Sequence, residues 1–177
     1  MSDLFEDTEN GGFFLYGEKG EALITRPKET YDGAMPSGNS VAGYVLRRLA
    51  ELTGNIAIME RAERQMSFLG AAASDYPSSK TFALIAAMSG VYESAQLVCV
   101  LPDSEKIVGL KKSLSGKFCP NTTILAKTPR NEKTLSQIAE FTGELVARDG
   151  KPTYYLCRNR SCTAPVHSLE MVLRELK

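Results

Sequence analysis

Polar side chains that could hold a small ligand are crowded into the ten residues from Tyr31 to Ser40. The stretch reads Tyr-Asp-Gly-Ala-Met-Pro-Ser-Gly-Asn-Ser, and its glycines, proline and short polar residues are typical of a loop. An apolar helical pattern follows, so Ser37 or Asn39 is expected to cap that helix. The free amides at such a helix start could attract an anion or a hydroxyl group. The alternative is a capped helix start that binds only its own backbone.

Charged residues lead into this loop and extend the candidate site. The sequence predicts a small polar ligand, such as a carbohydrate, held by Arg26, Glu29, Tyr31, Asp32, Ser37 and Asn39. A carboxylate pair of Glu29 and Asp32 could perform general acid and base work on a sugar, but the sequence does not place the two groups together. No catalytic residue is assigned, and solvated surface charge is the alternative interpretation.

The four cysteines are Cys99, Cys119, Cys157 and Cys162. They are too few and too scattered for a disulfide scaffold, so reduced thiols are the default expectation. Cys157 and Cys162 follow a predicted strand and enclose four residues, which differs from the thioredoxin-type C-x-x-C spacing. A structural role is favoured over a thiol redox role for this pair. With His167 they offer at most three ligands, fewer than a structural zinc site takes, so no metal is predicted.

His167 is the only histidine, so any Cys-His or Ser-His dyad would need it. It stands just before a predicted helix and no acid partner is evident, which favours an exposed or capping role. The sequence contains no P-loop, dinucleotide-binding fingerprint or H-E-x-x-H motif. Nucleotide and zinc-protease chemistry therefore have no support, and no cofactor is predicted.

Composition narrows the partners and the compartment. Hydrophobic residues make up 43% of the 177 residues, which indicates a folded core. Lysine plus arginine and aspartate plus glutamate number 21 each, so nucleic acid and anionic membrane surfaces are disfavoured as partners. The acidic N-terminus is unlike a signal peptide and no apolar run approaches a membrane span. We expect a cytoplasmic protein.

The first half of the chain predicts a hairpin and three helices. Two β-prone runs around a glycine-containing turn predict the hairpin over residues 11–26. Helical spacing of apolar residues follows, and Gly54, Asn55, and Ser78 or Ser79 are the expected helix ends or caps. The short connections predict an antiparallel layer, with the charges of residues 60–64 on a solvated face.

The second half predicts three strand-then-helix units. Their strands are expected at residues 95–101, 122–126 and 153–157, and such units imply a small parallel sheet. The fold class is therefore mixed α and β. We expect a division into residues 1–92, with the hairpin and helical layer, and residues 93–177, with the α/β portion.

Two stretches carry a family resemblance. Arg26-Pro-Lys-Glu-Thr-Tyr-Asp-Gly-Ala-Met-Pro-Ser-Gly-Asn-Ser40 and Tyr155-Leu-Cys-Arg-Asn-Arg-Ser-Cys162, with Pro165, resemble the carboxyl-terminal part of one family. These are the thioredoxin domain-containing proteins of the spermatogenesis-associated protein 20 type, which are widespread in bacteria. The resemblance runs from Gly11 to the end of the chain but covers only the last quarter or so of a typical member.

The resemblance implies a thioredoxin-like domain followed by an (α/α)6 barrel similar to N-acylglucosamine 2-epimerase and the six-hairpin glycosidases. It implies that the three helices belong to this α/α toroid and that residues 31–40 line the barrel mouth. The chain lacks the thioredoxin-like domain and most of the barrel, and the epimerase-type histidines have no counterparts. Helices from an incomplete toroid would expose apolar faces, so a homo-oligomer or a partner chain is expected.

Overall fold

The computed structural model describes residues 2–20, 24–159 and 161–176. Contacts divide the chain into two compact units. Unit 1 comprises Met1–Ala50 and Asn55–Val91, and unit 2 comprises Glu51–Gly54 and Tyr92–Lys177. The domain boundary between residues 92 and 93, expected from the sequence, remains a prediction.

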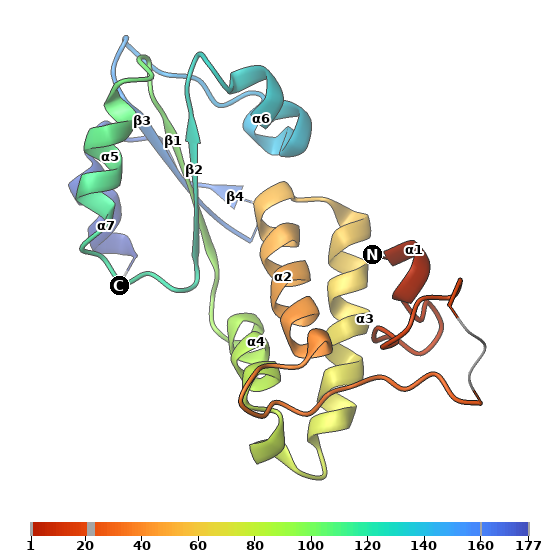
Figure 1. Ribbon diagram of the computed structural model, residues 1–177. Helices are drawn as coiled ribbons and strands as arrows, with labels where there is room; N and C mark the ends of the chain where they lie inside the picture. Colours follow the sequence, from red (N-terminus) through yellow and green to blue (C-terminus); the bar gives the residue numbers. More distant parts are fainter. Residues whose placement is uncertain (1, 21–23, 160, 177) are drawn as a thin grey trace. The chain divides into compact units, whose positions relative to one another are not determined.

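Unit 1 is helical (Figure 1). Its elements are α1 (Ser2–Phe5), α2 (Gly38–Thr53, the last three residues counted in unit 2), α3 (Ile56–Ala73), the 3-10 turn η1 (Pro77–Ser79) and α4 (Thr81–Val91). Helices α2 and α3 approach closely at Gly43, where a Cβ would lie 2.7 Å from Cδ1 of Leu69. Glycine is therefore required there by packing.

Local signals placed the end of α2 and the start of α3 correctly. Asn55 caps α3, because its side chain accepts a hydrogen bond from the Ile58 amide at 3.2 Å, and Gly54 ends α2 with a φ of 67°. Helix α4 continues through Gly90 and ends at Val91. A Cβ at Gly90 would lie 2.7 Å from the Arg47 guanidinium, so this glycine serves packing rather than a turn.

The predicted hairpin is not formed as a pair of strands. Residues 21–23, which belong to its second arm, lie outside the described residues, and the rest of residues 11–26 contains no strand. Phe13 instead makes an isolated antiparallel bridge with Glu6. Phe13 therefore packs in a helical core, whereas the Leu15 amide donates to the Pro27 carbonyl oxygen at 2.8 Å without the described residues forming strands.

Two glycines explain this difference. Gly11 and Gly12 have φ angles of 72° and 83°, a conformation that favours glycine and interrupts a strand. A Cβ at either position would lie 2.8 Å from atoms of α3, the Arg64 carbonyl oxygen or the Phe68 ring. The segment is thus fitted against α3, and Phe13 enters the core with 8% of its surface exposed.

The charged face of α3 is only partly solvated. Arg61 and Arg64 lie 3.4 and 3.6 Å from the Glu6 carboxylate, which is 7% exposed. The expectation of a solvated face is therefore wrong for these two arginines, which hold the N-terminal segment on α3.

Unit 2 contains a four-stranded mixed sheet in the order β2-β1-β3-β4. Its strands are β1 (Ala95–Val100), β2 (Thr122–Lys127), β3 (Thr153–Arg158) and β4 (Ser161–Cys162), and its helical elements are α5 (Lys106–Leu114), α6 (Glu132–Ile138), the 3-10 turn η2 (Glu140–Thr142) and α7 (Leu169–Glu175). Ser168 caps α7 as expected, accepting from the Met171 amide.

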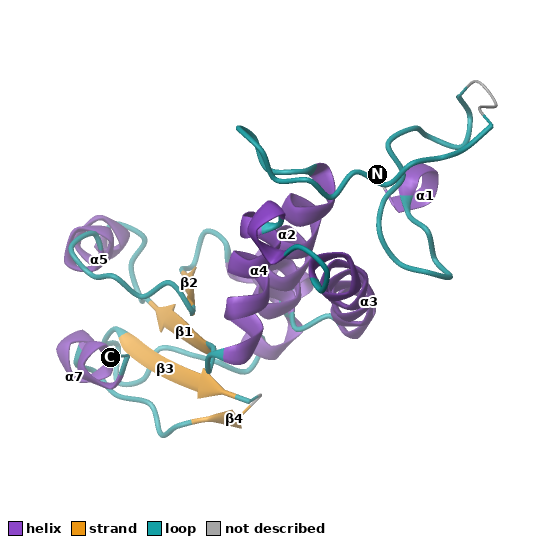
Figure 2. Cartoon of the chain, turned by 90° about the horizontal axis from the view of Figure 1, so that it is seen from below, coloured by secondary structure: helices purple, strands orange, loops and turns teal. Residues whose placement is uncertain are grey.

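Each face of the sheet carries its own apolar cluster. Helices α5 and α7 lie on the same side of the strands (Figures 1 and 2). They pack Leu110 and Val172 against Leu97, Cys99 and other residues that point to that face. Val98 and Val100 alternate to the opposite face, where Leu135 of α6 and Phe141 of η2 cover them. This alternation makes β1 the buried centre of the sheet.

The prediction of a parallel sheet is wrong for the third strand. β1 and β2 are parallel, with Ala95 opposite Thr122, but β3 is antiparallel to β1, with Val100 opposite Thr153. Residues 128–152, which join β2 to β3, are long enough to reach either end of the sheet. They return to the end where β2 finishes, so β3 runs back along β1.

Lys127, the last residue of β2, anchors that connection. Its side chain is 2% exposed, and its ammonium donates to the carbonyl oxygens of Thr142, Gly143 and Leu145 at 2.9, 3.2 and 2.9 Å. The Glu132 carboxylate lies 3.5 Å away. A charged residue at the end of a strand was not expected to be a core residue, because only the folded connection supplies its acceptors.

Candidate functional site

The Asp32 carboxylate is the centre of the loop from Tyr31 to Ser40. It is 8% exposed and accepts four hydrogen bonds. Its Oδ1 accepts from the Ser37 amide at 2.8 Å, and its Oδ2 accepts from the Ser40 hydroxyl at 3.0 Å. The Phe82 and Ala83 amides, in the first turn of α4, also donate to Oδ2, at 2.9 and 3.1 Å. One side chain therefore joins the starts of α2 and α4.

The pKa of Asp32 reflects this setting. Burial acts to raise the pKa of the carboxyl, but the hydrogen bonds from Ser37, Ala83, Ser40 and Phe82 outweigh burial and hold the pKa below its usual value. The charged form is thus the form that the loop is built around. Such a carboxylate is suited to capping helices rather than to accepting a proton from a substrate.

Ser37 is the cap of α2, one of the two residues expected there. Its hydroxyl oxygen accepts from the Ser40 amide at 3.1 Å and its hydroxyl donates to Ser40 Oγ at 2.9 Å. The expectation that Ser78 or Ser79 caps α4 is wrong. Asp32 takes this role from about fifty residues away, and the Ser79 hydroxyl donates to the Tyr76 carbonyl instead.

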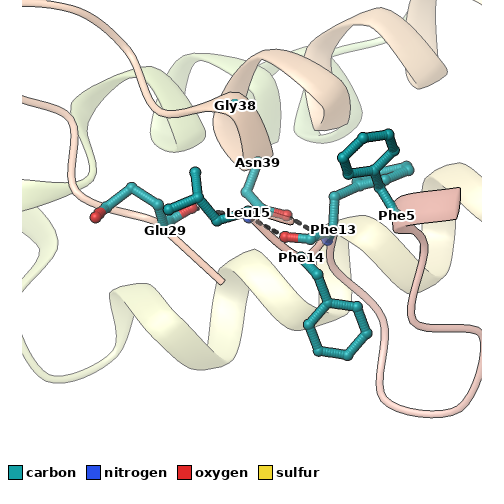
Figure 3. A pocket seen from close by; sticks show the side chains of 7 residues that line it. All are labelled: Phe5, Phe13, Phe14, Leu15, Glu29, Gly38 and Asn39. Atoms are coloured by element: carbon teal, nitrogen blue, oxygen red, sulfur yellow. Dashed lines mark hydrogen bonds between the residues drawn. The ribbon is translucent and has the colours of Figure 1, made fainter. Parts of the chain in front are cut away.

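Asn39 is used internally and is 3% exposed. Its Nδ2 donates to the carbonyl oxygens of Phe13 and Glu29 at 2.9 and 2.8 Å, and its Oδ1 accepts from the Phe13 amide at 2.6 Å (Figure 3). Gln65 of α3 donates to the same Oδ1 at 3.2 Å. Asn39 therefore links α2 to two segments, one that contains Phe13 and one that contains Glu29.

The cations that precede the loop stack on an aromatic ring. The Arg26 guanidinium carbon lies 4.0 Å from the centre of the Phe14 ring, and the Lys28 ammonium lies 4.9 Å from it. Lys28 also pairs with Asp7 at 2.6 Å, and Arg26 donates to the Tyr16 carbonyl at 3.0 Å. Both side chains thus stabilise the N-terminal segment.

Arg26, Glu29 and Tyr31 are the exposed members of the predicted set. Glu29 Oε1 accepts from the Tyr31 amide at 2.7 Å, and 61% of Tyr31 is exposed. The carboxylates of Glu29 and Asp32 have separate partners. Each carboxylate is thus engaged with donors of its own, and the acid and base pair considered from the sequence stays a prediction.

A cavity of about 290 Å³ adjoins the loop, within unit 1 (Figure 3). One part of its wall consists of the apolar side chains of Phe5, Phe13, Phe14 and Leu15. Glu29, Gly38 and Asn39 complete the lining. Of the six predicted ligand-binding residues, the cavity brings together Glu29 and Asn39. Sequence reasoning missed the phenylalanines, because it assigned Phe13 and Phe14 to a hairpin and gave Phe5 no role.

The expectation of four reduced thiols is wrong for one pair. Cys157 and Cys162 form a disulfide between opposite residues of β3 and β4, while Cys99 and Cys119 are free. Cys157 is 2% exposed and Cys162 is exposed. Burial raises the pKa of the Cys99 thiol to about 12, which makes this thiol unreactive at neutral pH.

His167 and the disulfide lie at opposite ends of β3. His167 Nδ1 is 3.0 Å from the Pro152 carbonyl oxygen, just before β3 begins, and its Nε2 is 3.7 Å from the Asp149 carboxylate. The grouping of His167 with Cys157 and Cys162 is therefore wrong. Among the described residues, no group of three or more histidine, cysteine or acidic side chains could hold a metal ion.

These observations define a mixed α/β chain with a helical unit and a small sheet, and with a loop that binds its own helix starts. None of the helices described between residues 2 and 176 is long and apolar enough to cross a membrane. No protein family profile matches the chain, and no solved structure matches it.

Curated relatives do match. Spermatogenesis-associated protein 20 of Homo sapiens is 25% identical over 166 residues, which cover 92% of this chain and 21% of the relative. The protein of the same name from Rattus norvegicus is 26% identical over the same shares. The chain is thus homologous to these proteins over most of its length, in agreement with the resemblance noted from the sequence. It spans about a fifth of the length of these relatives.

Proposed function

We propose that this chain is a non-catalytic packing module whose helices α2 and α4 dock against further α-helices, and whose loop from Tyr31 to Ser40 serves to hold those two helices in place. One observation carries the proposal. Helix α4 is apolar nearly all round, yet Leu84, Ile85 and Met88 are 40, 50 and 51% exposed. A helix of this composition needs cover on several sides.

Helix α2 adds a second exposed apolar stripe. Val41 and Val45 stand four residues apart, which puts them on one face, and they are 39 and 44% exposed. Side chains of this kind on two helices of one unit favour a partner surface that is also apolar.

The partner surface that fits is the apolar face of other helices. The relatives are about five times as long as the matched segment, so their aligned segment is joined to much more chain. The resemblance implies that part of this length is a toroid of paired helices. When this chain is studied by itself, the available partner with apolar helix faces is a second copy of the chain. The proposal therefore agrees with the homo-oligomer expected from the sequence.

Size-exclusion chromatography with light scattering tests this proposal. At micromolar concentration the chain should elute with at least twice its monomer mass of 19.3 kDa. The double variant Val45→Lys with Ile85→Lys should weaken the association at least about tenfold, because it buries two ammonium groups without partners.

The control is Ser67→Lys, which adds one such charge at an exposed position of α3, and each single variant, Val45→Lys or Ile85→Lys, is its match in charge. The control should leave the association unchanged, and far-ultraviolet circular dichroism should show equal helix content in all variants. A wild-type chain that stays monomeric, or equal weakening in the control, would contradict the proposal.

A small polar ligand such as a carbohydrate at the same loop is a weaker proposal. It would have to displace internal bonds, since Asp32, Ser37 and Asn39 already bind other parts of unit 1. Arg26, Glu29 and Tyr31 are the members of the predicted set that would offer it exposed groups. Rising melting temperature with added sugar would favour this alternative.

The disulfide favours a second candidate, a thiol redox role at Cys157 and Cys162. Because Cys162 is exposed and Cys157 is buried, a small thiolate would attack Cys162 Sγ. A mixed disulfide would form there, and Cys157 would leave as a thiolate that takes up a proton. A second thiol would then release Cys162 as a thiol, so that two thiols are oxidised to one disulfide.

Titration with reduced and oxidised glutathione tests this role, with mass spectrometry as the readout. In a Cys119→Ser background the pair should interconvert reversibly, and Cys157→Ser should trap one glutathione on Cys162. A pair that stays fully oxidised in millimolar reduced glutathione would leave the disulfide a purely structural link.

A further inference from the structure

The cavity beside α2 is chemically different from the loop that it adjoins. The loop is polar, but its polar atoms bind one another, whereas the cavity is bounded largely by Phe5, Phe13, Phe14 and Leu15. Leu15 is 54% exposed although it stands in this apolar wall. An apolar surface that faces solvent is stabilised when an apolar ligand covers it.

The size of the cavity limits the ligand to a small molecule. A cavity of about 150 Å³ can hold benzene, and sites for drug-sized ligands begin at about 300 Å³. At about 290 Å³, this cavity suits one ring with small substituents. Phenylalanine side chains in the wall favour an aromatic ring, since they can pack against its edge or face.

The charges around the cavity favour a neutral ligand. Glu29, in the lining, would repel an anion. Arg26 and Lys28 lie 4.0 and 4.9 Å from the centre of the Phe14 ring and would repel a cation that approaches this wall. A charged ring compound would therefore meet at least one group of its own sign.

A hydroxyl group matches the polar part of the lining. The Asn39 side chain is occupied by Phe13, Glu29 and Gln65, so it has little to offer a ligand. The lining still contains Glu29, whose backbone carbonyl oxygen accepts from Asn39, and Gly38, the first residue of α2. A hydroxyl can donate to a carbonyl oxygen and accept from a backbone amide.

We propose that this cavity binds a neutral, single-ring aromatic molecule that carries a hydroxyl group. The ring lies against the phenylalanine wall, and the hydroxyl faces Glu29 and the start of α2. This ligand is the opposite of the sugar expected from the sequence, because the wall that the sequence assigned to a hairpin is apolar. The inference goes beyond the packing role and does not depend on it.

Gly38 allows the site to be blocked without disturbing the fold. A Cβ at Gly38 meets no atom within 4 Å outside its own helical turn and chain neighbours, so Gly38→Leu can place a side chain next to the cavity without a clash. Gly70→Leu is the matched control, since a Cβ at Gly70 of α3 also meets no atom within 4 Å and Gly70 does not line the cavity.

Titration with phenol, followed by amide chemical shifts in nuclear magnetic resonance, tests the proposal. Phenol should shift the amides of Phe13, Leu15 and Gly38 saturably, and benzoate, benzylamine and glucose should each bind at least about tenfold more weakly. Gly38→Leu should weaken phenol binding at least tenfold, and Gly70→Leu should not change it.

Three outcomes would overturn the proposal. The first is that phenol at millimolar concentration shifts no resonance of these residues. The second is that phenol binds wild type and Gly38→Leu equally well. The third is that glucose binds more tightly than phenol. The first outcome needs only the wild-type chain, so the proposal stays falsifiable even if a variant fails to fold. The oligomeric state of the same samples reports separately on the packing role.

Discussion

Asp32→Ala lowers the free energy of unfolding of unit 1 by about 3 to 4 kcal/mol, the largest effect that we expect from a single substitution in that unit. The carboxylate accepts from two amides of α4, one amide before α2 and the Ser40 hydroxyl. Alanine leaves these donors without their acceptor in a site that is 8% exposed. Chemical denaturation with hydrogen exchange at residues 37–41 and 81–84 measures the loss and its location.

Asp75→Ala is the control, because Asp75 is exposed and follows the end of α3. It should change stability by less than about 0.5 kcal/mol. The prediction is contradicted if the two substitutions have equal effects on stability. It is also contradicted if hydrogen exchange in Asp32→Ala rises only outside the starts of α2 and α4.

The effect of Asp32 also depends on pH. Its folded pKa lies below the ordinary value of 3.8, so its contribution to stability is fully present above about pH 4 and is lost as the pH falls through the folded pKa. Asp32→Asn should therefore flatten the acid limb of the stability curve. The pKa of Asp7 is also lowered, by the Asn10 amide and by Lys28. Any loss of stability at acid pH that the Asp32→Asn variant still shows is therefore attributed to Asp7.

Lys127→Met destabilises unit 2 by about 2 to 3 kcal/mol, the second large effect. Methionine roughly preserves the apolar stem of a side chain that is 2% exposed, but it offers no donor to the carbonyl oxygens of Thr142, Gly143 and Leu145. Hydrogen exchange should rise first over residues 139–152, since the ammonium ties this connection to the end of β2.

Lys133→Met separates this role from the loss of a positive charge in general. Lys133 stands on α6, close in sequence, and is exposed. Its replacement should be nearly neutral. If both lysine variants lose the same stability, net charge rather than the three hydrogen bonds explains the result.

Features determined by neighbouring residues were predictable from the sequence. The Asn55 and Ser168 caps and the α2 turn at Gly54 were expected, because a cap bonds an amide three residues away and a left-handed turn favours glycine. The parallel pairing of β1 with β2 followed from the strand-then-helix order.

Features determined by distant residues were not predictable. Asp32 accepts from α4 across fifty residues, and Lys127 finds its acceptors fifteen to eighteen residues away. The orientation of β3 depends on how far the connection after α6 travels, which the pattern of apolar residues does not encode. The same limit applied to the cavity, whose apolar wall combines Phe5 with the consecutive residues Phe13, Phe14 and Leu15.

The sequence contained a local signal for the disulfide that was not recognised. Arg158 pairs with Ser161 across a tight turn, and Asn159 has a φ of 50°. Asparagine is one of the residues that tolerate this conformation, so Asn159 between the cysteines could have indicated a two-residue hairpin turn. Cysteines on either side of such a turn lie opposite each other, as Cys157 and Cys162 do.

One carboxylate shared by two helix starts makes the capping of α4 inseparable from the closure of a fifty-residue loop. In an ordinary helix the cap forms as soon as the local chain turns, and the helix can be populated before the rest of the domain assembles. Here α4 gains its cap only when the segment before α2 has arrived. Capping of α4 is therefore a late, cooperative event, and fraying at its first turn should accompany any opening of the Tyr31–Ser40 loop.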